Sequence, residues 1–512
     1  MFELIKTAGF TVAALLAGLL ALQFCARRAV AATLVPKLMI LTIVTQFAAF
    51  CSPTLLVFNV IVALSVPLFA TERRLIAPIY IYLLLTLPMV SSFLGTSSLY
   101  ITAYDVSMSI AFGGLMALLM RSKGAHTRSM QWDLPIFLFF LLLVVQGSRD
   151  TTFTNVLRVT TAQTLQVLLP YYVISRSIRT LEDLRGAVFG LVAATAALSV
   201  LAAFEALRSW PLFRIIWSHY NIPLGSGASV KLRGGFLRSP GPFPEPTTFA
   251  NCLAVGVIAT YALRSAFRSK SHHLAILAVV VIGIVAPQSR GAWMGAVIGI
   301  ALFQLFHLGL AKVGQLALFG SIAALAVAAN AGVADRISST LGLGGGPDYR
   351  VSLFNRGVEE VKRYPVIGRP IDQVLFSLRD LVQGEGMVDF VNTYLFFALV
   401  TGLVGMTVLI ITLIWPLVPL WAMRGKRVIA RVDQQQIAFV FAGSVSMIVM
   451  LTVQSLTGRI IVMITVLMAM GSSVLNHHRV LARGASPLGR RKPAEAPAQP
   501  PATDLQPVEQ PQ

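Results

Sequence analysis

The feature that most constrains this chain is a series of apolar runs that recur from one end of the sequence to the other. Many of them approach 20 residues, the length at which an α-helix crosses the hydrocarbon core of a bilayer. Only 12% of the 512 residues are charged and 56% are hydrophobic, so a soluble protein of this length could not cover its surface. We therefore predict an all-α polytopic membrane protein.

Hydropathy predicts about fifteen spans, and the expected number of transmembrane helices is roughly twelve to fifteen. Stretches 38–51 and 134–146 are short for a span, and 395–423 is long enough to begin with a re-entrant or interfacial segment. Residues 8–25 are followed, not preceded, by arginines, which indicates an uncleaved first span rather than a signal peptide. The predicted spans are 8–25, 38–51, 54–70, 75–94, 100–120, 134–146, 158–175, 186–206, 248–265, 272–288, 291–309, 314–333, 395–423, 436–452 and 458–476.

Lysine and arginine gather in particular connectors between these spans. The basic positions are Arg73, Arg74, Arg121, Lys123, Arg128, Arg176, Arg179, Arg185, Arg264, Arg268, Lys270, Arg424, Lys426, Arg427 and Arg431, with further ones in the C-terminal tail. The positive-inside rule predicts that these connectors and the tail are cytoplasmic. It also accounts for the formal net charge of +20. Because no basic stripe alternates with aromatics in a soluble region, we do not expect nucleic acid as a partner.

This orientation divides the chain into six segments and leaves one large loop on the outer face. That loop should be partly helical, because Leu353, Phe354, Val358 and Val361 recur at helical spacing before Pro365. The segments are N-terminal transmembrane helices (1–206), a first outer loop (207–247), transmembrane helices with a Ser-Arg-Gly turn (248–333), a large outer loop (334–390), C-terminal transmembrane helices (391–476) and a disordered cytoplasmic tail (477–512).

Arginines on the predicted outer face are the main candidates for chemistry. Arg233 and Arg238 lie in the first loop, Arg290 follows in the turn that Gly291 should allow, and Arg350 and Arg356 lie in the large loop. An arginine at a membrane boundary is costly unless it is paired or hydrated. Its planar fork also suits bidentate binding of phosphate. We therefore predict that these side chains converge on a phosphate group, with interface snorkelling or pairing to Asp and Glu as the alternative.

Several soluble-enzyme motifs are missing from the sequence. It contains no GxxxxGK[ST] loop, no HExxH and no Asp-x-Asp pair, which argues against ATP hydrolysis and against a cytoplasmic sugar-nucleotide site. Cys25, Cys51 and Cys252 all lie in apolar runs, so neither disulfides nor a metal site is expected. We predict no metal and no cofactor.

Three segments resemble the O-antigen ligase and O-antigen polymerase superfamily of bacterial membrane glycosyltransferases. "RGGF…PGPFPEPTTFANCLA" resembles its Arg-Gly-x-Phe segment leading into a helix, and "QSRGAWMGA" resembles its Ser-Arg-Gly turn. In "VNTYLFFALVTGLVG", Asn392, Gly402 and Gly405 match the end of the family's large loop. In addition to these three, "YRVSLFNRGVEEVKRYPVIG" is similar to the family's amphipathic helix and Pro-x-x-Gly turn. The resemblance covers roughly residues 170–420 and implies a glycosyltransferase of the bacterial inner membrane. The first outer loop (207–247) and the large outer loop (334–390) would then be periplasmic loops.

One position departs from the ligase pattern. Val391 occupies the place of the ligase histidine, and valine can neither accept nor donate a proton. We therefore favour the polymerase branch, and "PGPFPEPTTFA" looks most like exopolysaccharide polymerases of the superfamily. A ligase with a different base remains open. A transporter or flippase for lipid-linked sugars also remains open, although repeat symmetry and charges deep within spans, which such proteins need, are scarce here.

The resemblance implies a mechanism in which an oligosaccharide on undecaprenyl pyrophosphate is the donor. Arg233 and Arg290 would hold the diphosphate as negative charge develops on it. A carboxylate would deprotonate the attacking sugar hydroxyl, with Glu245 as first candidate, Asp389 as second and Glu385 as third; each could instead be a loop charge or an ion-pair partner.

Two further expectations follow from the sequence and the resemblance. Asn392 should fix a helix start rather than touch substrate, although it could bind a sugar hydroxyl, and Gly402 and Gly405 should allow close helix packing. Partners implied by a polymer pathway include a chain-length regulator and export proteins.

Overall fold

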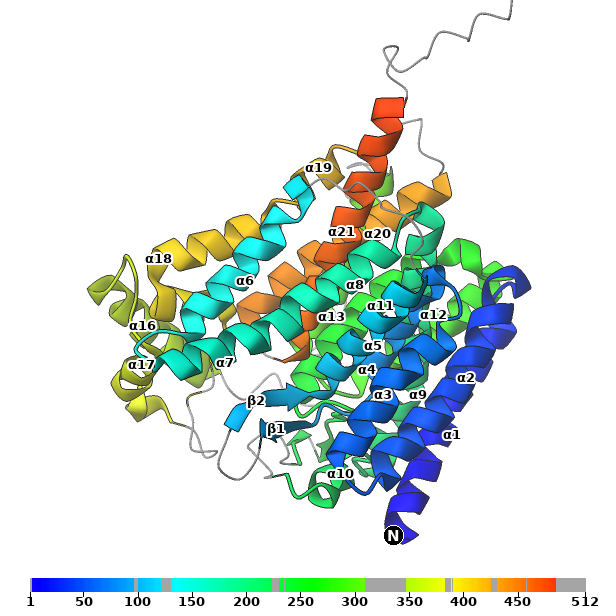
Figure 1. The fold of residues 1–512 in the computed structure, drawn as a ribbon, viewed down its shortest axis with the longest axis horizontal. Helices are drawn as coiled ribbons and strands as arrows, with labels where there is room; N and C mark the ends of the chain where they lie inside the picture. The colour runs from blue at the N-terminus through cyan, green and yellow to red at the C-terminus, as the bar shows by residue number, and fades with distance from the viewer. Residues whose placement is uncertain are drawn as a thin grey trace, which may run out of the picture.

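The computed structural model describes residues 2–95, 100–121, 130–222, 230–233, 235–308, 347–382, 388, 390–424, 431–456 and 458–484. Within these ranges the chain is a bundle of helices with two short antiparallel hairpins (Figure 1). The first half holds α1 (Phe2–Cys25), α2 (Arg28–Cys51), α3 (Leu55–Phe69), α4 (Ile76–Thr86), α5 (Val106–Arg121), α6 (Leu134–Gly147), α7 (Phe153–Gln163), α8 (Leu169–Ser177), α9 (Leu181–Arg208) and α10 (Arg214–His219). The second half holds α11 (Pro246–Ala262), α12 (Lys270–Val285), α13 (Arg290–Leu308), α16 (Pro347–Arg363), α17 (Ile371–Ser377), α18 (Thr393–Ile414), α19 (Leu417–Trp421), α20 (Arg431–Met450) and α21 (Arg459–Gly484).

The all-α multi-pass membrane fold is confirmed. In the described part of the chain, six helical stretches are long and apolar enough to cross a bilayer, namely α1, α2, α9, α18 with α19, α20 and α21. Four shorter apolar helices, α3, α5, α6 and α12, accompany them. The total of twelve to fifteen spans stays a prediction, and the expected span at 314–333 lies outside the described residues.

Two predicted spans are helical only in part, because a β-hairpin occupies their facing ends. The spans 75–94 and 100–120 contain strands β1 (Ser91–Gly95) and β2 (Tyr100–Asp105), which pair antiparallel. Pro88 cannot donate a helical hydrogen bond, so α4 ends before it. Strand β2 contains Tyr100, Ile101, Thr102 and Tyr104, aromatic and β-branched residue types that favour strand over helix.

The basic connectors gather at one end of the bundle. The Nε atom of Arg27 donates to the Phe267 carbonyl oxygen (2.9 Å), and that of Arg268 donates to the Ala26 carbonyl oxygen (3.0 Å). Arg73 donates to the Ser177 carbonyl oxygen (2.7 Å) and pairs with Asp183 (3.2 Å). The guanidinium groups thus satisfy carbonyl oxygens at helix ends, where cations are favoured.

Helix α9 runs from the basic end of the bundle to its opposite end, so its length gives the distance between them. It begins with a capping box between Thr180 and Asp183, in which the side chain of each accepts from the other's backbone N–H. Glu205, near its C-terminus, is fully buried. Twenty-two residues separate the two carboxylates, which corresponds to about 33 Å along the helix. Residues that contact Glu205 therefore lie about one bilayer thickness from the basic connectors.

The predicted amphipathic helix of the large loop is present as α16, which begins at Pro347, before the first residue of the apolar pattern. It shares a small separate core with α17 and the start of α18, to one side of the main bundle (Figure 1). Leu353, Val374 and Leu378 are buried there against Leu395 and Leu399. The large loop therefore contains structure of its own.

Helix α18 is broken at Gly402, where a turn from the large loop enters it. Gly402 has φ +70° and ψ −175°, which is not helical. The Leu403 amide donates to the Pro365 carbonyl oxygen (2.8 Å), and the Arg369 amide donates to the Leu399 carbonyl oxygen (2.9 Å). Close packing at Gly402 was predicted between helices; the neighbour is instead this turn, whose backbone would clash with a β-carbon at Gly402.

Two boundaries also differ from prediction. Helix α2 begins at Arg28, ten residues before the expected span, and contains Pro36. Helix α21 continues to Gly484, into the segment expected to be a disordered tail from 477. Residues 485–512 lie outside the described part of the chain.

Candidate anion-binding site

The buried carboxylate of Glu205, in α9, forms hydrogen bonds with the first predicted loop (207–247). One oxygen accepts from the Ser239 hydroxyl (2.6 Å) and the Gly241 amide (3.0 Å), and the other accepts from the Leu212 amide (2.9 Å). A buried carboxylate is tolerated only with such partners. Glu205 was not among the predicted site residues. Its signal in the sequence is a lone acidic residue near the end of an apolar run.

The proline-rich turn after Ser239 is held from a second direction. The Met89 amide donates to the Pro242 carbonyl oxygen (2.8 Å), and the Phe243 ring stacks on Phe249 with centroids 5.4 Å apart. Gly241 has φ +55°, a conformation that glycine adopts readily. The loop segment that leads into α11 is therefore a fixed surface.

Two predicted arginines lie on a hairpin that faces the turn before α13. Strand β3 (Leu232–Arg233) pairs with β4 (Phe236–Leu237). The Nη1 atom of Arg233 donates to the Gln288 carbonyl oxygen (2.8 Å), and the Nε atom of Arg238 donates to the Pro287 carbonyl oxygen (3.1 Å). Both guanidinium groups thus lie at the turn that leads to Arg290.

Four guanidinium groups lie close enough for their positive charges to act on one another. Burial lowers the pKa of Arg233, and the charges of Arg290 and Arg350 lower it further. Burial lowers the pKa of Arg238 to about 10, with additional effects from the positive charge of Arg233, the opposing charge of Glu245 and the positive charge of Arg350. Each remains a cation at neutral pH. These charge interactions place Arg233, Arg238, Arg290 and Arg350 near one another, and we call these four the arginine cluster.

Glu245 lies beside the arginine cluster at the start of α11. It is the N-cap residue of that helix, but its side chain makes no capping hydrogen bond. Its two carboxylate oxygens instead accept from the Lys231 ammonium at 3.0 and 3.1 Å. About a third of each side chain is exposed. Glu245 is thus a partly accessible carboxylate next to the arginines.

The other predicted site residues do not join this arrangement. Arg356 pairs with Glu359 (3.3 Å) and Asp380 (3.6 Å) within the large loop, as the alternative reading of these arginines expects. Asn392 caps α18 by accepting from the Tyr394 and Leu395 amides, which agrees with its predicted role at a helix start. The candidate bases Asp389 and Glu385 lie outside the described residues.

The turn before α13 differs from the sequence prediction. Gly291 was expected to form it, but Arg290 is already the first residue of α13 and Gly291 is helical. Gln288 adopts the left-handed conformation instead, with φ +52°. A β-carbon at Gly291 would lie 2.6 Å from Val453, so that glycine serves close packing.

The structure adds one arginine that the sequence analysis did not single out. Arg459, the first residue of α21, is 1% exposed. In the described part of the chain, none of its three side-chain nitrogen atoms has a hydrogen-bond partner. Its position at the boundary of a predicted span was the available signal.

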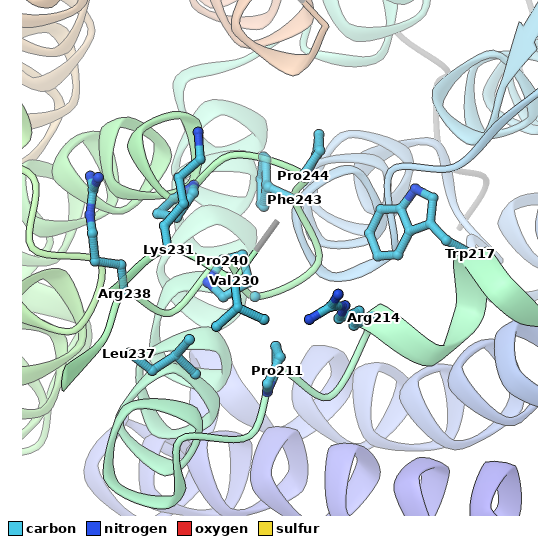
Figure 2. A pocket seen from close by; sticks show the side chains of 12 residues that line it. Pro211, Arg214, Trp217, Val230, Lys231, Leu237, Arg238, Pro240, Phe243 and Pro244 are labelled. Carbon is cyan, nitrogen blue, oxygen red and sulfur yellow. The ribbon is translucent and has the colours of Figure 1, made fainter. Parts of the chain in front are cut away.

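A pocket adjoins the arginine cluster between α10 and the β3–β4 hairpin (Figure 2). Residues of α10, of the β3–β4 hairpin and of the proline-rich turn before α11 line it. No protein-family model and no curated protein matches this chain. The assignment below therefore depends on the arginine cluster, Glu245 and the adjoining pocket.

Proposed function

We propose that the protein is a polysaccharide polymerase that joins oligosaccharide repeat units carried on undecaprenyl pyrophosphate, at the periplasmic face of the bacterial inner membrane. The observation that supports it best is the arginine cluster. Four guanidinium groups from β3, the segment after β4, α13 and α16 act on one another at one end of a membrane bundle. Mutual repulsion makes such a cluster unfavourable without an anion, and phosphate oxygens fit guanidinium groups best.

The position of the arginine cluster supports a reaction on the periplasmic side of the membrane. Two of its members, Arg233 and Arg238, belong to the loop that Glu205 holds at the far end of α9, away from the basic connectors at the other end. By the positive-inside rule that basic end faces the cytoplasm. A diphosphate lipid headgroup lies at the depth of the opposite interface.

In the proposed reaction, the anomeric carbon of the donor glycan loses its bond to the diphosphate oxygen and gains one to an acceptor hydroxyl oxygen. Arg233 and Arg290 stabilise the charge that develops on the departing diphosphate. Glu245 takes the proton of the acceptor hydroxyl. These groups supply the charge stabilisation without a metal ion.

The test is polymer formation by the purified full-length protein in proteoliposomes, with a lipid-linked repeat unit as substrate and a product ladder as readout. We expect Arg233→Ala and Arg290→Ala to lose at least about 100-fold in rate, while Arg208→Ala, an exposed arginine at the end of α9, keeps wild-type activity. Normal ladders from both cluster variants would exclude the diphosphate role.

The main alternative is a ligase that transfers glycan once to a different acceptor with a base other than histidine. It uses the same cluster, so the product separates the two functions. A ladder of many repeats on the lipid carrier identifies a polymerase, and a single transfer to another acceptor identifies a ligase. Movement of the lipid across vesicles without a new glycosidic bond would instead identify a transporter.

A further inference from the structure

The turn that enters the break in α18 carries two exposed apolar side chains. This turn, residues 364–368, follows α16, and its residues Val366 and Ile367 are 61% and 66% exposed. The Val404 amide donates to the Val366 carbonyl oxygen (3.3 Å), so the turn lies beside Leu403 and Val404 of α18. Both are exposed apolar residues in a stretch that is long and apolar enough to span a bilayer. The apolar surface of the turn therefore adjoins that of a spanning helix.

The backbone of this turn has its partners within the protein. Each of the four carbonyl oxygens of residues 365–368 accepts a hydrogen bond: the Leu403 and Val404 amides donate to the first two, and the Arg149 guanidinium donates to the last two. Arg149 also donates to the Val400 carbonyl oxygen, which the break deprives of its helical donor. Water can satisfy carbonyl oxygens in an aqueous loop, whereas in the hydrocarbon region each one needs a donor from the protein. The turn thus combines exposed apolar side chains with carbonyl oxygens that meet the requirement of a lipid environment.

Helix α6 indicates the depth at which the turn lies. Asp133, the residue before α6, pairs with Arg176 (2.8 Å) at the basic end of the bundle. The 14 residues of α6 extend about 21 Å from there, which is less than the roughly 30 Å of the hydrocarbon core. Arg149, which donates to the turn, follows the end of α6 by two residues. The turn therefore lies close to the outer boundary of the hydrocarbon core.

Residues typical of the membrane interface flank the two aliphatic side chains. Lys362, Arg363 and Tyr364 precede Val366, and all three are exposed. The guanidinium carbon of Arg369 lies 4.6 Å from the centroid of the Tyr364 ring. Aromatic rings and long cationic side chains are favoured at the level of lipid headgroups, where their apolar parts lie against acyl chains. This pattern fits a turn whose tip enters the acyl chains while its flanks lie among lipid phosphates.

We propose that Val366 and Ile367 insert into the acyl chains of the outer leaflet, so that α16 and α17 dock on the bilayer instead of extending into the aqueous phase. The partner is the phospholipid bilayer, because the apolar surface adjoins a spanning helix and its carbonyl oxygens need no water. The inference does not depend on the polymerase function. Arg350 belongs to α16, so docking holds one member of the arginine cluster close to the lipid headgroups.

The experiment measures the depth of nitroxide spin labels in the membrane. It compares their collisions with oxygen, which concentrates in acyl chains, and with a nickel chelate, which stays in water. Single labels are attached to Val366→Cys and Ile367→Cys in the full-length protein, with Cys25, Cys51 and Cys252 replaced by alanine. The protein is placed in vesicles of phosphatidylethanolamine and phosphatidylglycerol. Two label positions are used because either substitution alone could disturb the turn.

Two reference labels define the outcomes. Leu141→Cys, an exposed apolar position on α6, reports the lipid environment, and Glu359→Cys, an exposed polar position on α16, reports water. We expect the ratio of oxygen to nickel collisions at both turn positions to match the Leu141 label and to exceed the Glu359 label several-fold. Frequent collisions with the nickel chelate at both turn positions would show that the turn faces water. Rare collisions with both reagents would show that protein covers it, as in contact with a second copy of the chain. Either result would overturn the inference.

Discussion

The guanidinium carbon of Arg459 lies 5.0 Å from the centroid of the Phe243 ring, beneath the proline-rich turn that borders the pocket. A cation over an aromatic face is favourable, more so in a dry environment. The negative charge of Asp105, which is 7% exposed, also acts on Arg459 through space. The turn between Ser239 and Glu245 therefore covers a buried charge at the start of α21.

This relationship predicts energetic coupling between Asp105 and Arg459. Arg459→Met leaves the buried carboxylate of Asp105 without its compensating cation. Asp105→Asn leaves the buried cation of Arg459 without its compensating carboxylate. Each single change should therefore destabilise the protein. The double variant should recover part of the loss, with a coupling of about 1 kcal/mol or more. Thermal unfolding of the four proteins in one detergent measures it. Strictly additive effects would show that the two charges do not interact.

Glu245→Gln tests the proposed base. The amide retains the shape but cannot accept a proton, so the polymerisation rate should fall at least about 100-fold. Lys231→Met serves as the comparison, because it removes the ion pair but leaves the carboxylate in place. It should change the pH profile of the reaction more than its maximum rate. Equal losses in the two variants would assign Glu245 to positioning of Lys231 instead.

Arg350→Gln tests whether repulsion between the four positive charges of the arginine cluster destabilises the protein when no anion is bound. Arg350 is exposed and its charge acts on Arg233 and Arg238. Its removal should raise the unfolding temperature of the free protein by about 1 °C at low salt, and the gain should vanish near 0.5 M salt, roughly the range where exposed charges are screened. Added pyrophosphate should stabilise this variant less than the wild type. A lower unfolding temperature in low salt would contradict a repulsive cluster.

The break in α18 predicts a sharp difference between Gly402 and a glycine with open space around it. Gly402→Ala requires a positive φ and places a β-carbon 2.1 Å from the Val366 carbonyl oxygen, so it should cost at least about 2 kcal/mol. A β-carbon at Gly186 in α9 would meet no atom within 4 Å, so Gly186→Ala should be tolerated. Faster proteolysis of residues 347–382 in Gly402→Ala than in Gly186→Ala would be the readout. Equal cleavage would mean that the turn does not depend on the break.

Arg149 also contacts the region where α18 is broken. Its guanidinium donates to the carbonyl oxygen of Ile367, in the turn that enters the break, and to that of Val400, just before the break in α18. The sequence offered no reason to select it, because an arginine after an apolar run is an ordinary interfacial residue. Its partners come from segments more than 200 positions away.

The sequence alone determined the properties that depend on local composition. Apolar runs of bilayer length made the chain helical and membrane-bound, and charge in the connectors indicated that Arg73 and Arg268 share one end. A guanidinium at a membrane boundary requires a partner, and this chemistry singled out Arg233, Arg238, Arg290, Arg350 and Arg356.

Only the tertiary structure decided which of these groups meet. Glu205, Arg149 and Arg459 act through contacts between distant segments, and no local pattern records such contacts. The β1–β2 hairpin and the break at Gly402 arise because backbone hydrogen bonds that the helices lack are satisfied by another part of the chain. Local preference sets the elements, and long-range hydrogen bonding and charge decide how they assemble into a site.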